Sequence, residues 1–485
     1  MHVNKRRLIL FGNNPPTSLL LKQSILKNNS VVCKNDMMVG GQDINLYDEL
    51  YVLGNDGEND RALVFFKDLA GQYSLSDHDD EKLMCHLLVH VRNRLRMLQT
   101  CDVCSGVRQK MDLYPFTIED LWSRSIRLDY EPITVHSDKH VHLVIFGMGE
   151  VAETMAIHAA HVAHYPNYIR NHSLRTRITM ISENTEMLSD ELIKRYRHLF
   201  DNSYYRIVKP SEEDTVRVFH KPMYEGKRED FVDVEWEFVD AESWHPDVRE
   251  KLKRWAQDDK QLLTVVIADR DENKNEAMSL FLPDELYQRS MPIHKYSPSD
   301  VEYDVTMPLV QMAKNVNYIY DQCFKQNFES WQGWIQSTVE IEPKERERLW
   351  ANLPNVKRWS NIYNAMTIPS KMRSIGLSED DWNQFYDISQ QDIEILAQVE
   401  HNRWNVEELI LGYRPCTDEE QEKIAADVEI QKDAFRARKI HYDLRAYNDL
   451  RPDKTGKSAK VYDLCLSAAL PLIAKTFVDE KGGRE

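Results

Sequence analysis

Short apolar runs alternate with longer, helix-like segments through the first 300 residues of the chain. Runs of strand length occur at residues 7–11, 51–53, 62–66, 141–146, 177–181, 235–239 and 262–268. Patterns with helical spacing occur at residues 15–26, from 77–80 to 98, at 150–164 and at 273–281. Because strands that alternate with helices normally build parallel sheets, this part of the chain is predicted to be α/β.

Beyond about residue 305 the strand-like runs disappear and helical spacing dominates. The predicted helices are residues 312–328, 344–350, 356–366, 392–410, 421–440 and 462–477. We therefore predict two tandem Rossmann-like, doubly wound α/β domains followed by a mainly α-helical domain. Their boundaries are placed at 1–135 and 140–305, with a helical linker region at 306–380 and the helical domain at 381–478.

The two α/β domains differ in the turn that follows their first strand. In the first domain the turn reads Gly12-Asn13-Asn14-Pro15, so it has no second glycine that lets main chain approach a pyrophosphate. We expect a structural or degenerate nucleotide fold there. In the second domain the turn fits the pattern GxGxxA, with the residues Gly147, Met148, Gly149, Glu150, Val151 and Ala152.

This second turn has the parts needed to hold an anion. Gly147 allows the sharp turn from strand to helix, Gly149 leaves room for a phosphate, and Ala152 permits close packing of helix on strand. The helix that begins here offers free N–H groups and a partial positive charge. The turn therefore predicts binding of NAD(H) or another adenine nucleotide. The alternative is a Rossmann fold without a ligand, because the carboxylate of Glu150 is unfavourable beside a phosphate.

Two later strand ends add candidate ligand contacts. Glu183 follows the strand at 177–181 and is placed to bond a ribose hydroxyl. Asp269 and Arg270 follow the strand at 262–268, beside which doubly wound sheets bind ligands. Arg270 could reach a phosphate there, or the two residues could form a plain surface turn.

Composition narrows the class of protein. The net charge of −17 repels phosphate backbones, so direct nucleic-acid binding is not expected. Seven irregularly spaced cysteines suit a reducing, cytoplasmic compartment. The apolar runs are too short for a membrane span, and residues 8–11 are too short for a signal peptide. His158, His161 and His164 share a helical face, but no carboxylate completes a metal site, so we expect surface or interface histidines.

Signatures of catalysis are missing from the sequence. It has no Tyr-x-x-x-Lys pair, no G-x-S-x-G nucleophile elbow and no P-loop. A regulatory protein is therefore favoured over an enzyme. Two alternatives stay open: an NAD-dependent enzyme with a proton donor such as His158 or Asp269, and an interaction scaffold whose Rossmann folds hold no ligand.

The central segment resembles the TrkA-N (RCK) domains of potassium-uptake regulators, in VHLVIFGMGEVAETMAIHAA (141–160) and LLTVVIADRDENKNEAMSLFL (262–282). That resemblance implies a Rossmann fold that binds NAD(H) or another nucleotide. The C-terminal segment resembles the RyR domain, the repeat named after ryanodine receptors, in LAQVEHNRWNVEELILGYRP (396–415) and RKIHYDLRAYNDLRP (438–452). RWSNIYNAMTIPSKMRSIGL (358–377) looks like the segment that precedes RyR domains in bacterial fusions. Such fusions look like ligand sensors whose ligands are poorly defined.

The RyR-like segment has its own candidate binding residues. They mix flat aromatic surfaces with planar cations, a combination that holds nucleotides or phosphorylated ligands. The candidates are Glu400, Arg403, Trp404, Tyr413, Arg414 and His441. The alternative for Glu400 and Arg403 is structural, because Glu400, Arg403 and Glu407 can pair along one helix.

Together these patterns predict a cytoplasmic, nucleotide-sensing regulatory protein. Its central domain would bind a small-molecule nucleotide, and its RyR-like domain a second ligand or a partner. Because related regulators often pair through Rossmann faces, we expect a homo-oligomer, in the first place a dimer. A role in potassium transport would require a separate membrane channel subunit as partner, and another protein partner is the alternative.

Overall fold

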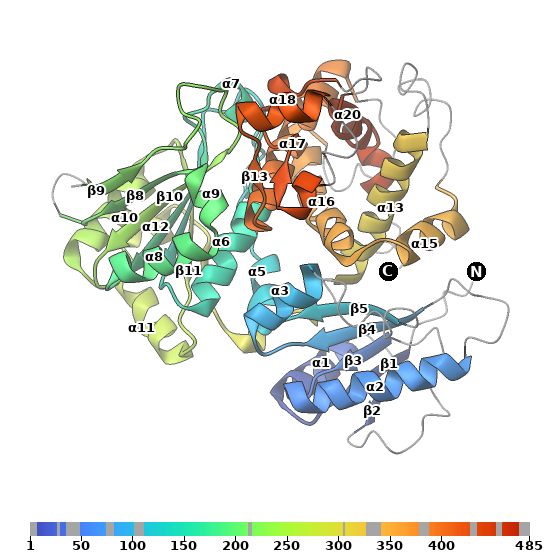
Figure 1. Ribbon diagram of the computed structural model, residues 1–485. Coiled ribbons are helices and arrows are strands. Elements are labelled where there is room, and N and C mark those ends of the chain that lie inside the picture. The colour runs from blue at the N-terminus through green and yellow to red at the C-terminus, as the bar shows by residue number, and fades with distance from the viewer. Residues whose placement is uncertain are drawn as a thin grey trace. The chain divides into compact units, whose positions relative to one another are not determined.

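The computed structural model describes residues 7–26, 30–34, 49–73, 82–100, 111–211, 216–303, 306–325, 341–377, 388–426, 434–452 and 458–474. These residues form two compact units (Figure 1). The first unit is built from the described parts of Met1–Ser125, Pro298–Met307 and Ile341–Asn361. The second is built from those of Ile126–Ser297, Pro308–Glu340 and Ile362–Glu485. Each unit contains one largely parallel sheet with helices, so the predicted α/β class is confirmed.

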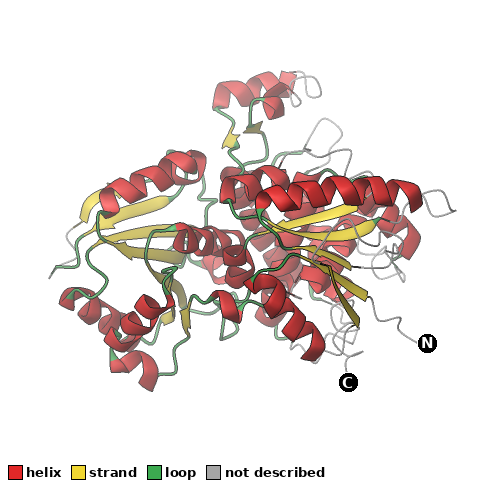
Figure 2. Cartoon of the chain, turned by 90° about the horizontal axis from the view of Figure 1, so that it is seen from below, coloured by secondary structure: helices red, strands yellow, loops and turns green. Residues whose placement is uncertain are grey.

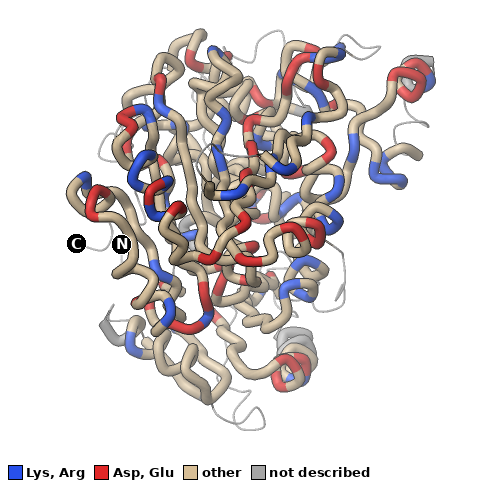
Figure 3. The backbone as a smooth tube through the Cα atoms, turned by 90° about the vertical axis from the view of Figure 1, so that its left-hand side faces the viewer, with Lys and Arg blue, Asp and Glu red and all other residues tan. Residues whose placement is uncertain are grey.

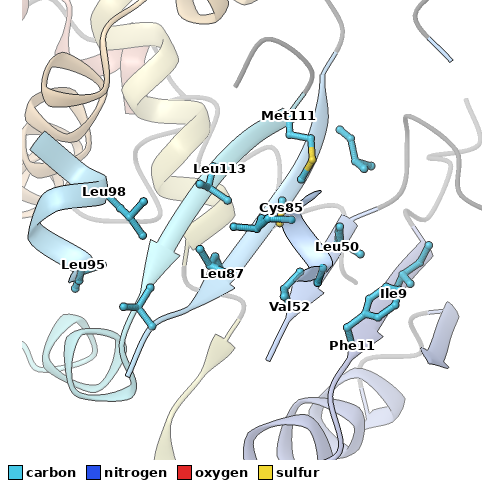
Figure 4. Close-up of a cluster of buried hydrophobic side chains, with 14 residues drawn as sticks. Ile9, Phe11, Leu50, Val52, Cys85, Leu87, Leu95, Leu98, Met111 and Leu113 are labelled. Atoms are coloured by element: carbon cyan, nitrogen blue, oxygen red, sulfur yellow. The ribbon is translucent and has the colours of Figure 1, made fainter. Parts of the chain in front are cut away.

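The first unit holds a five-stranded, fully parallel sheet in the order β2-β1-β3-β4-β5. Its strands are β1 (Arg7–Phe11), β2 (Ser30–Lys34), β3 (Glu49–Val52), β4 (Leu83–Leu88) and β5 (Met111–Phe116). Its helices are α1 (Pro15–Leu26), α2 (Asp56–Tyr73), α3 (Arg92–Thr100), α5 (Ile118–Arg124), η2 (Pro298–Asp300) and α15 (Pro343–Ala351). Figure 4 shows the apolar core, in which side chains such as Leu50, Leu87 and Leu113 meet Leu98 of α3.

Two predictions in this unit are wrong. Residues 62–66 were expected to form a strand but belong to α2, in which Val64 is 59% exposed and so lacks a place in a core sheet. The helix expected to reach residue 98 is instead the strand β4 followed by the shorter α3. All six residues of β4 are buried, so the strand has no polar face to reveal its period. The start expected for that helix, 77–80, lies outside the described residues.

The second unit holds a seven-stranded sheet in the order β12-β11-β6-β7-β10-β8-β9. The strands are β6 (His140–Phe146), β7 (Thr176–Ser182), β8 (Tyr204–Val208), β9 (Val216–His220), β10 (Val234–Asp240), β11 (Gln261–Ile267) and β12 (Ile293–Lys295). Every neighbouring pair is parallel except β8 and β9. The strands predicted at 141–146, 177–181, 235–239 and 262–268 are confirmed as β6, β7, β10 and β11.

Helices cover both faces of this sheet (Figure 2). They are α6 (Glu150–Val162), α7 (Asn167–Arg170), α8 (Thr185–Arg195), α9 (Arg197–Asp201), α10 (Pro246–Gln257), α11 (Glu272–Phe281) and α12 (Asp284–Gln288). On one face, side chains of α10, α11 and α12 such as Leu252, Met278 and Leu286 join one core with Val144 and Val265 of the strands. Helix α6 contacts β6 and β7. These features are compatible with a Rossmann-like domain.

The C-terminal part of the chain is mainly helical, as expected. Its elements are α13 (Thr306–Lys325), α16 (Asn355–Ser374), α17 (Gln390–Ile410), β13 (Arg414–Pro415), α18 (Asp418–Ala426), β14 (Ile440–His441), η6 (Tyr447–Asp449) and α20 (Lys460–Ala468). The long helix predicted at 421–440 is wrong at its end, where Ile440 pairs with Arg414 in a two-stranded sheet. Residues 326–328, 427–433 and 475–477 of the predicted helices lie outside the described residues.

Two properties of the described chain bear on where it could act. None of its described helices is both long and apolar enough to cross a lipid bilayer. Figure 3 shows Lys and Arg positions interspersed with Asp and Glu positions along the backbone, with no long run of one sign.

Candidate functional site

The strand order of the second sheet reverses between β6 and β11. Strands β7 to β10 all lie on one side of β6, and the chain then returns to the other side for β11 and β12. In doubly wound sheets, the carboxyl ends of the strands on either side of such a reversal border the ligand crevice. Here the GxGxxA turn follows β6, and Asp269 and Arg270 follow β11. The Ala268 N–H donates to the Phe146 carbonyl at 3.0 Å, so the two loops leave the sheet side by side.

Gly147 makes the turn from β6 toward α6. Its φ of +114° lies in the region that favours glycine. A Cβ at this position would lie 3.5 Å from the Ala268 carbonyl oxygen and 3.8 Å from the Ala152 Cβ, so space is adequate and conformation is the constraint. Ala152 is fully buried with its small side chain next to the turn, and the preceding residue, Val151, is also buried.

Gly149 is the N-cap residue of α6 and leaves open space above the helix. Its φ is −75°, no side chain caps the helix, and a Cβ placed on it would meet nothing within 4 Å. The first intrahelical bond runs from the Glu153 N–H to the Gly149 carbonyl at 2.9 Å. The amides of residues 150–152 therefore have no acceptor within the helix. Open space next to such amides is the arrangement by which helices hold anions.

An ion pair joins the loop after β6 to the loop after β11. Arg270 Nη2 lies 2.5 Å from Glu150 Oε2, and the two side chains are 61% and 33% exposed. Glu150 repels a phosphate at the amides, while Arg270 attracts one. A phosphate that displaced Glu150 would free Arg270 to bind it. Met148 is half-buried in the same turn.

Asp269 shapes the loop after β11. Its carboxylate accepts the Asp271 N–H at 2.9 Å and lies 3.7 Å from Lys274 Nζ. The buried Asn275 side chain bonds both the N–H and the carbonyl of Asp269, at 3.0 and 2.8 Å, and also the Tyr296 carbonyl at 2.9 Å. Asp269 is thus engaged in holding the turn. Asn275 is a positioning residue that the sequence reasoning missed.

Glu183 lies at the expected edge of the sheet. It follows β7, the neighbour of β6, and its side chain is exposed. The next residue, Asn184, has a φ of +57° and precedes α8. The structure therefore places Glu183 at the carboxyl end of the strand adjoining the glycine turn, where a ribose-binding acid stands in dinucleotide folds.

His158 and His161 of α6, and His164 just after the end of that helix, are buried. His164 bonds Asp233 through Nδ1 at 2.8 Å and the Ala160 carbonyl through Nε2 at 3.0 Å. His161 stacks on Tyr363 of α16 with ring centroids 3.9 Å apart, and His158 is 7% exposed. A surface placement is therefore wrong, and the alternative of an interface fits, because α6 also packs against α17 (Figure 1). Within the described residues, no three potential ligands gather to hold a metal ion.

Glu400 and Arg403 belong to a buried charge network. Arg403 Nε and Nη2 bond Glu400 at 2.9–3.0 Å, and Nη1 bonds Glu407 at 2.6 Å. Lys371 Nζ of α16 bonds Glu400 Oε2 at 2.5 Å. Burial alone would raise the pKa of Glu400, but Arg403 and Lys371 hold this pKa at about 2. Because these groups already bond one another, the arrangement favours the structural alternative for Glu400 and Arg403.

Trp404, Tyr413 and His441 lie together on another side of α17. The His441 ring stands edge-on to Trp404 at 4.8 Å and to Tyr413 at 6.0 Å. Arg414 instead forms a two-pronged pair with Glu420, at 2.7 and 2.8 Å. Of the six RyR-like candidates, three are thus gathered into one aromatic cluster, and the other three are engaged in ion pairs.

Comparison with known proteins adds no assignment. No protein-family model, no curated protein and no solved structure matches this chain. The functional argument therefore rests on the geometry of the chain itself.

Proposed function

We propose that the chain is a nucleotide-sensing regulatory protein. NAD(H) or another adenine nucleotide binds the turn from Gly147 to Ala152, with its phosphates on the amides at the start of α6. Glu183 receives the ribose, and Arg270 exchanges Glu150 for a phosphate. The C-terminal helices, which resemble an RyR domain, bind a second ligand or a partner.

The observation that carries this proposal is the open space at Gly149. A parallel sheet reverses its strand order there, the helix that follows lacks a side-chain cap, and a Cβ would meet no atom within 4 Å. The φ of Gly149 is one that any residue can adopt, and no neighbouring atom excludes a side chain, so the backbone does not require glycine at this position. Room for a ligand gives it a reason.

The packing of α6 suggests how occupancy is reported. The amino end of α6 borders the crevice, while its outer face meets α17 and, through His161 on Tyr363, α16. A shift of α6 on nucleotide binding would therefore be felt in the RyR-like helices. Packed helices have discrete arrangements, which makes such a shift a usable signal.

Regulation is favoured over nicotinamide chemistry by the state of the two suggested acids. His158 is buried within α6, and the Asp269 carboxylate holds its own loop. Neither stands as a proton donor beside a hydride site. The scaffold alternative is favoured by one observation, the Glu150–Arg270 pair, because it engages Arg270 with a carboxylate of the protein itself.

A thermal-shift screen tests the proposal directly. The full chain is heated with NAD, NADH, ATP or a cyclic nucleotide, beside the variant Gly149→Ser. A ligand at a hundredfold excess over its Kd should stabilise the parent by about 2.7 kcal/mol, and the Ser side chain should abolish the shift by filling the space. No shift with any of these nucleotides, or an equal shift in the variant, would contradict the proposal.

The cellular setting is part of the same proposal. We place the protein in the cytoplasm, as a homodimer formed through its Rossmann-like part. A role in potassium transport would act through a separate membrane channel subunit. Analytical ultracentrifugation of the full chain measures the dimer, and a strictly monomeric chain would remove that element.

A further inference from the structure

Arg445 is held in a fixed position against α17. Its carbonyl accepts hydrogen bonds from His401 Nε2 at 3.0 Å and Asn405 Nδ2 at 2.9 Å. Both donors are buried, and His401 is fixed in turn by Asp463 at 3.1 Å. The main chain at Arg445 is therefore set by the core of the RyR-like part.

The guanidinium of Arg445 is buried and forms no ion pair within the part of the chain that the structure describes. The residue is 5% exposed, and its Nε and Nη2 both donate to the Tyr442 carbonyl, at 3.0 and 2.7 Å. The group also lies over the Tyr442 ring, 4.8 Å from its centre. Among the described residues, no carboxylate forms an ion pair with it, and Nη1 makes no hydrogen bond.

This isolation is unusual, because buried arginines are normally paired. Burial lowers the pKa of Arg445, yet a guanidinium stays protonated in proteins. The guanidinium of Arg403 is also buried, but two carboxylates of its own helix, α17, pair with it. A positive charge kept from water without a partner is costly, and a bound anion would offset that cost.

A second cationic side chain, that of Arg228, lies in the same region of the fold. Arg228, from the segment between β9 and β10, donates to the Cys416 carbonyl at 3.2 Å and also pairs with the exposed Asp418. Cys416 belongs to a buried cluster against which Tyr442 packs, and the Arg445 guanidinium lies over the Tyr442 ring. Among the described residues, Asp443, two positions before Arg445 in the chain, forms no ion pair with it. Two arginines from distant parts of the chain thus converge beside Cys416.

We propose that Arg445 and Arg228 form an anion site for a phosphate-bearing small molecule. The inference rests on the part of the proposed function that gives the RyR-like helices a ligand, and it does not depend on the glycine crevice. Phosphate is the fitting class, because planar guanidinium groups bond phosphate oxygens two at a time. The free Nη1 of Arg445 supplies the first bond, and Arg228 turns from Asp418 to supply the second.

Calorimetry with sodium pyrophosphate on the full-length Gly149→Ser chain tests this site while the glycine crevice is filled. Binding should persist in that background and weaken on the order of tenfold or more in R445M, the loss expected for one charge-assisted hydrogen bond. R438M is the matched control. Arg438 also lies over an aromatic ring, 5.0 Å from the centre of Phe435, but its side chain is 63% exposed, so R438M should bind as the parent does.

R228M is a second test in case R445M fails to fold, because Arg228 is partly exposed and pairs with the exposed Asp418. It should weaken pyrophosphate binding while the far-ultraviolet circular dichroism stays unchanged. Without ligand, R445M should melt at or above the temperature of its parent, because an unpaired buried charge has been removed. Two results would overturn the inference. One is that the Gly149→Ser chain does not bind pyrophosphate, and the other is that R445M and R228M in that background bind it as tightly as the Gly149→Ser chain does. Neither result would bear on nucleotide binding by the parent, which keeps the two proposals separable.

Discussion

The two large sheets of the described chain each reverse their strand order once, and the turns at the two reversals differ in how much space they leave. In the first unit the reversal lies between β1 and β3. There a Cβ on Gly12 would lie 3.0 Å from the Gly54 nitrogen and 3.0 Å from the Leu53 carbonyl carbon. The Asn14 side-chain amide also donates to the Leu53 carbonyl. The position is filled by the protein's own main chain.

In the second unit the counterpart of Gly12 is Gly147, which also has a positive φ and lies near the main chain of the next loop. The second glycine of that turn, Gly149, has no neighbour within reach of a Cβ, and its place in the first unit is taken by Asn14. One architecture thus uses glycine for two purposes: to let main chains approach, and to leave a space. The difference teaches that a strand order alone does not indicate a ligand. The space around each glycine is the better indication of a ligand. Substitutions that add a side chain at each glycine test this.

The largest effect is expected for Gly12→Ala. The new methyl group would meet main-chain atoms that cannot move aside, at a residue whose φ is +123°. Strain and overpacking together should lower the free energy of unfolding by about 3 kcal/mol or more. Urea denaturation measures it. Gly57→Ala in α2 is the control and should stabilise slightly, because its Cβ would meet only Asn55 Oδ1 at 3.5 Å.

Gly147→Ala should have an intermediate effect. Its φ of +114° is strained for alanine, but the nearest atom to the Cβ lies 3.5 Å away. Only the conformational cost applies, so the loss should be about 1–2 kcal/mol in the same urea experiment. A greater loss than for Gly12→Ala would reverse the comparison between the two turns.

Glu150→Gln should improve nucleotide binding. The substitution removes the carboxylate that pairs with Arg270 and repels phosphate. Exposed charge interactions of this kind are worth up to about 1 kcal/mol, so the affinity should rise by roughly fivefold at low salt and by less at high salt. Titration calorimetry at two salt concentrations measures the change.

The matched control for that titration is Glu153→Gln. Glu153 lies one turn further along α6 and pairs with Arg195 at 2.5 Å. It should leave the affinity unchanged. Weaker binding by Glu150→Gln would mean that the glutamate helps to hold the ligand, contrary to our account.

The smallest effect is expected on the stability of Gly149→Ser. Serine is a better N-cap residue than glycine, and the Cβ would meet no atom. The free energy of unfolding should rise by about 0.3 kcal/mol, even though the nucleotide is lost. A clear destabilisation would show that the space at Gly149 is needed by the fold.

Sequence patterns were sufficient where a local signal was strong. The apolar run at 141–146 and the glycines that follow it predicted β6 and the start of α6. The start of α2 also carries a local signal in the sequence, a pair of residues that cap the helix. The Asn55 side chain accepts the Glu58 N–H, and the Glu58 carboxylate accepts the Asn55 N–H, which is a capping box readable in the sequence. Residues 62–66 would then have been placed in a helix.

Other features depend on parts of the chain that lie far apart in sequence. Arg403 is satisfied partly along its own helix, but its partner Glu400 is also bound by Lys371 of α16. The isolation of Arg445 depends on which acids fail to reach it in three dimensions. The ion pair between Glu150 and Arg270 joins two loops that the sequence separates by a whole half of the sheet. No periodicity or spacing contains such information.

The central claim is that the amides at the start of α6 hold the phosphates of a nucleotide. A crystal structure of the full chain grown with NAD or ATP tests it most directly. We predict phosphate density within hydrogen-bond distance of the main-chain nitrogens of residues 149–152, with Glu150 turned away from Arg270. An empty turn with Glu150 still paired to Arg270, at a nucleotide concentration that saturates binding in solution, would contradict it.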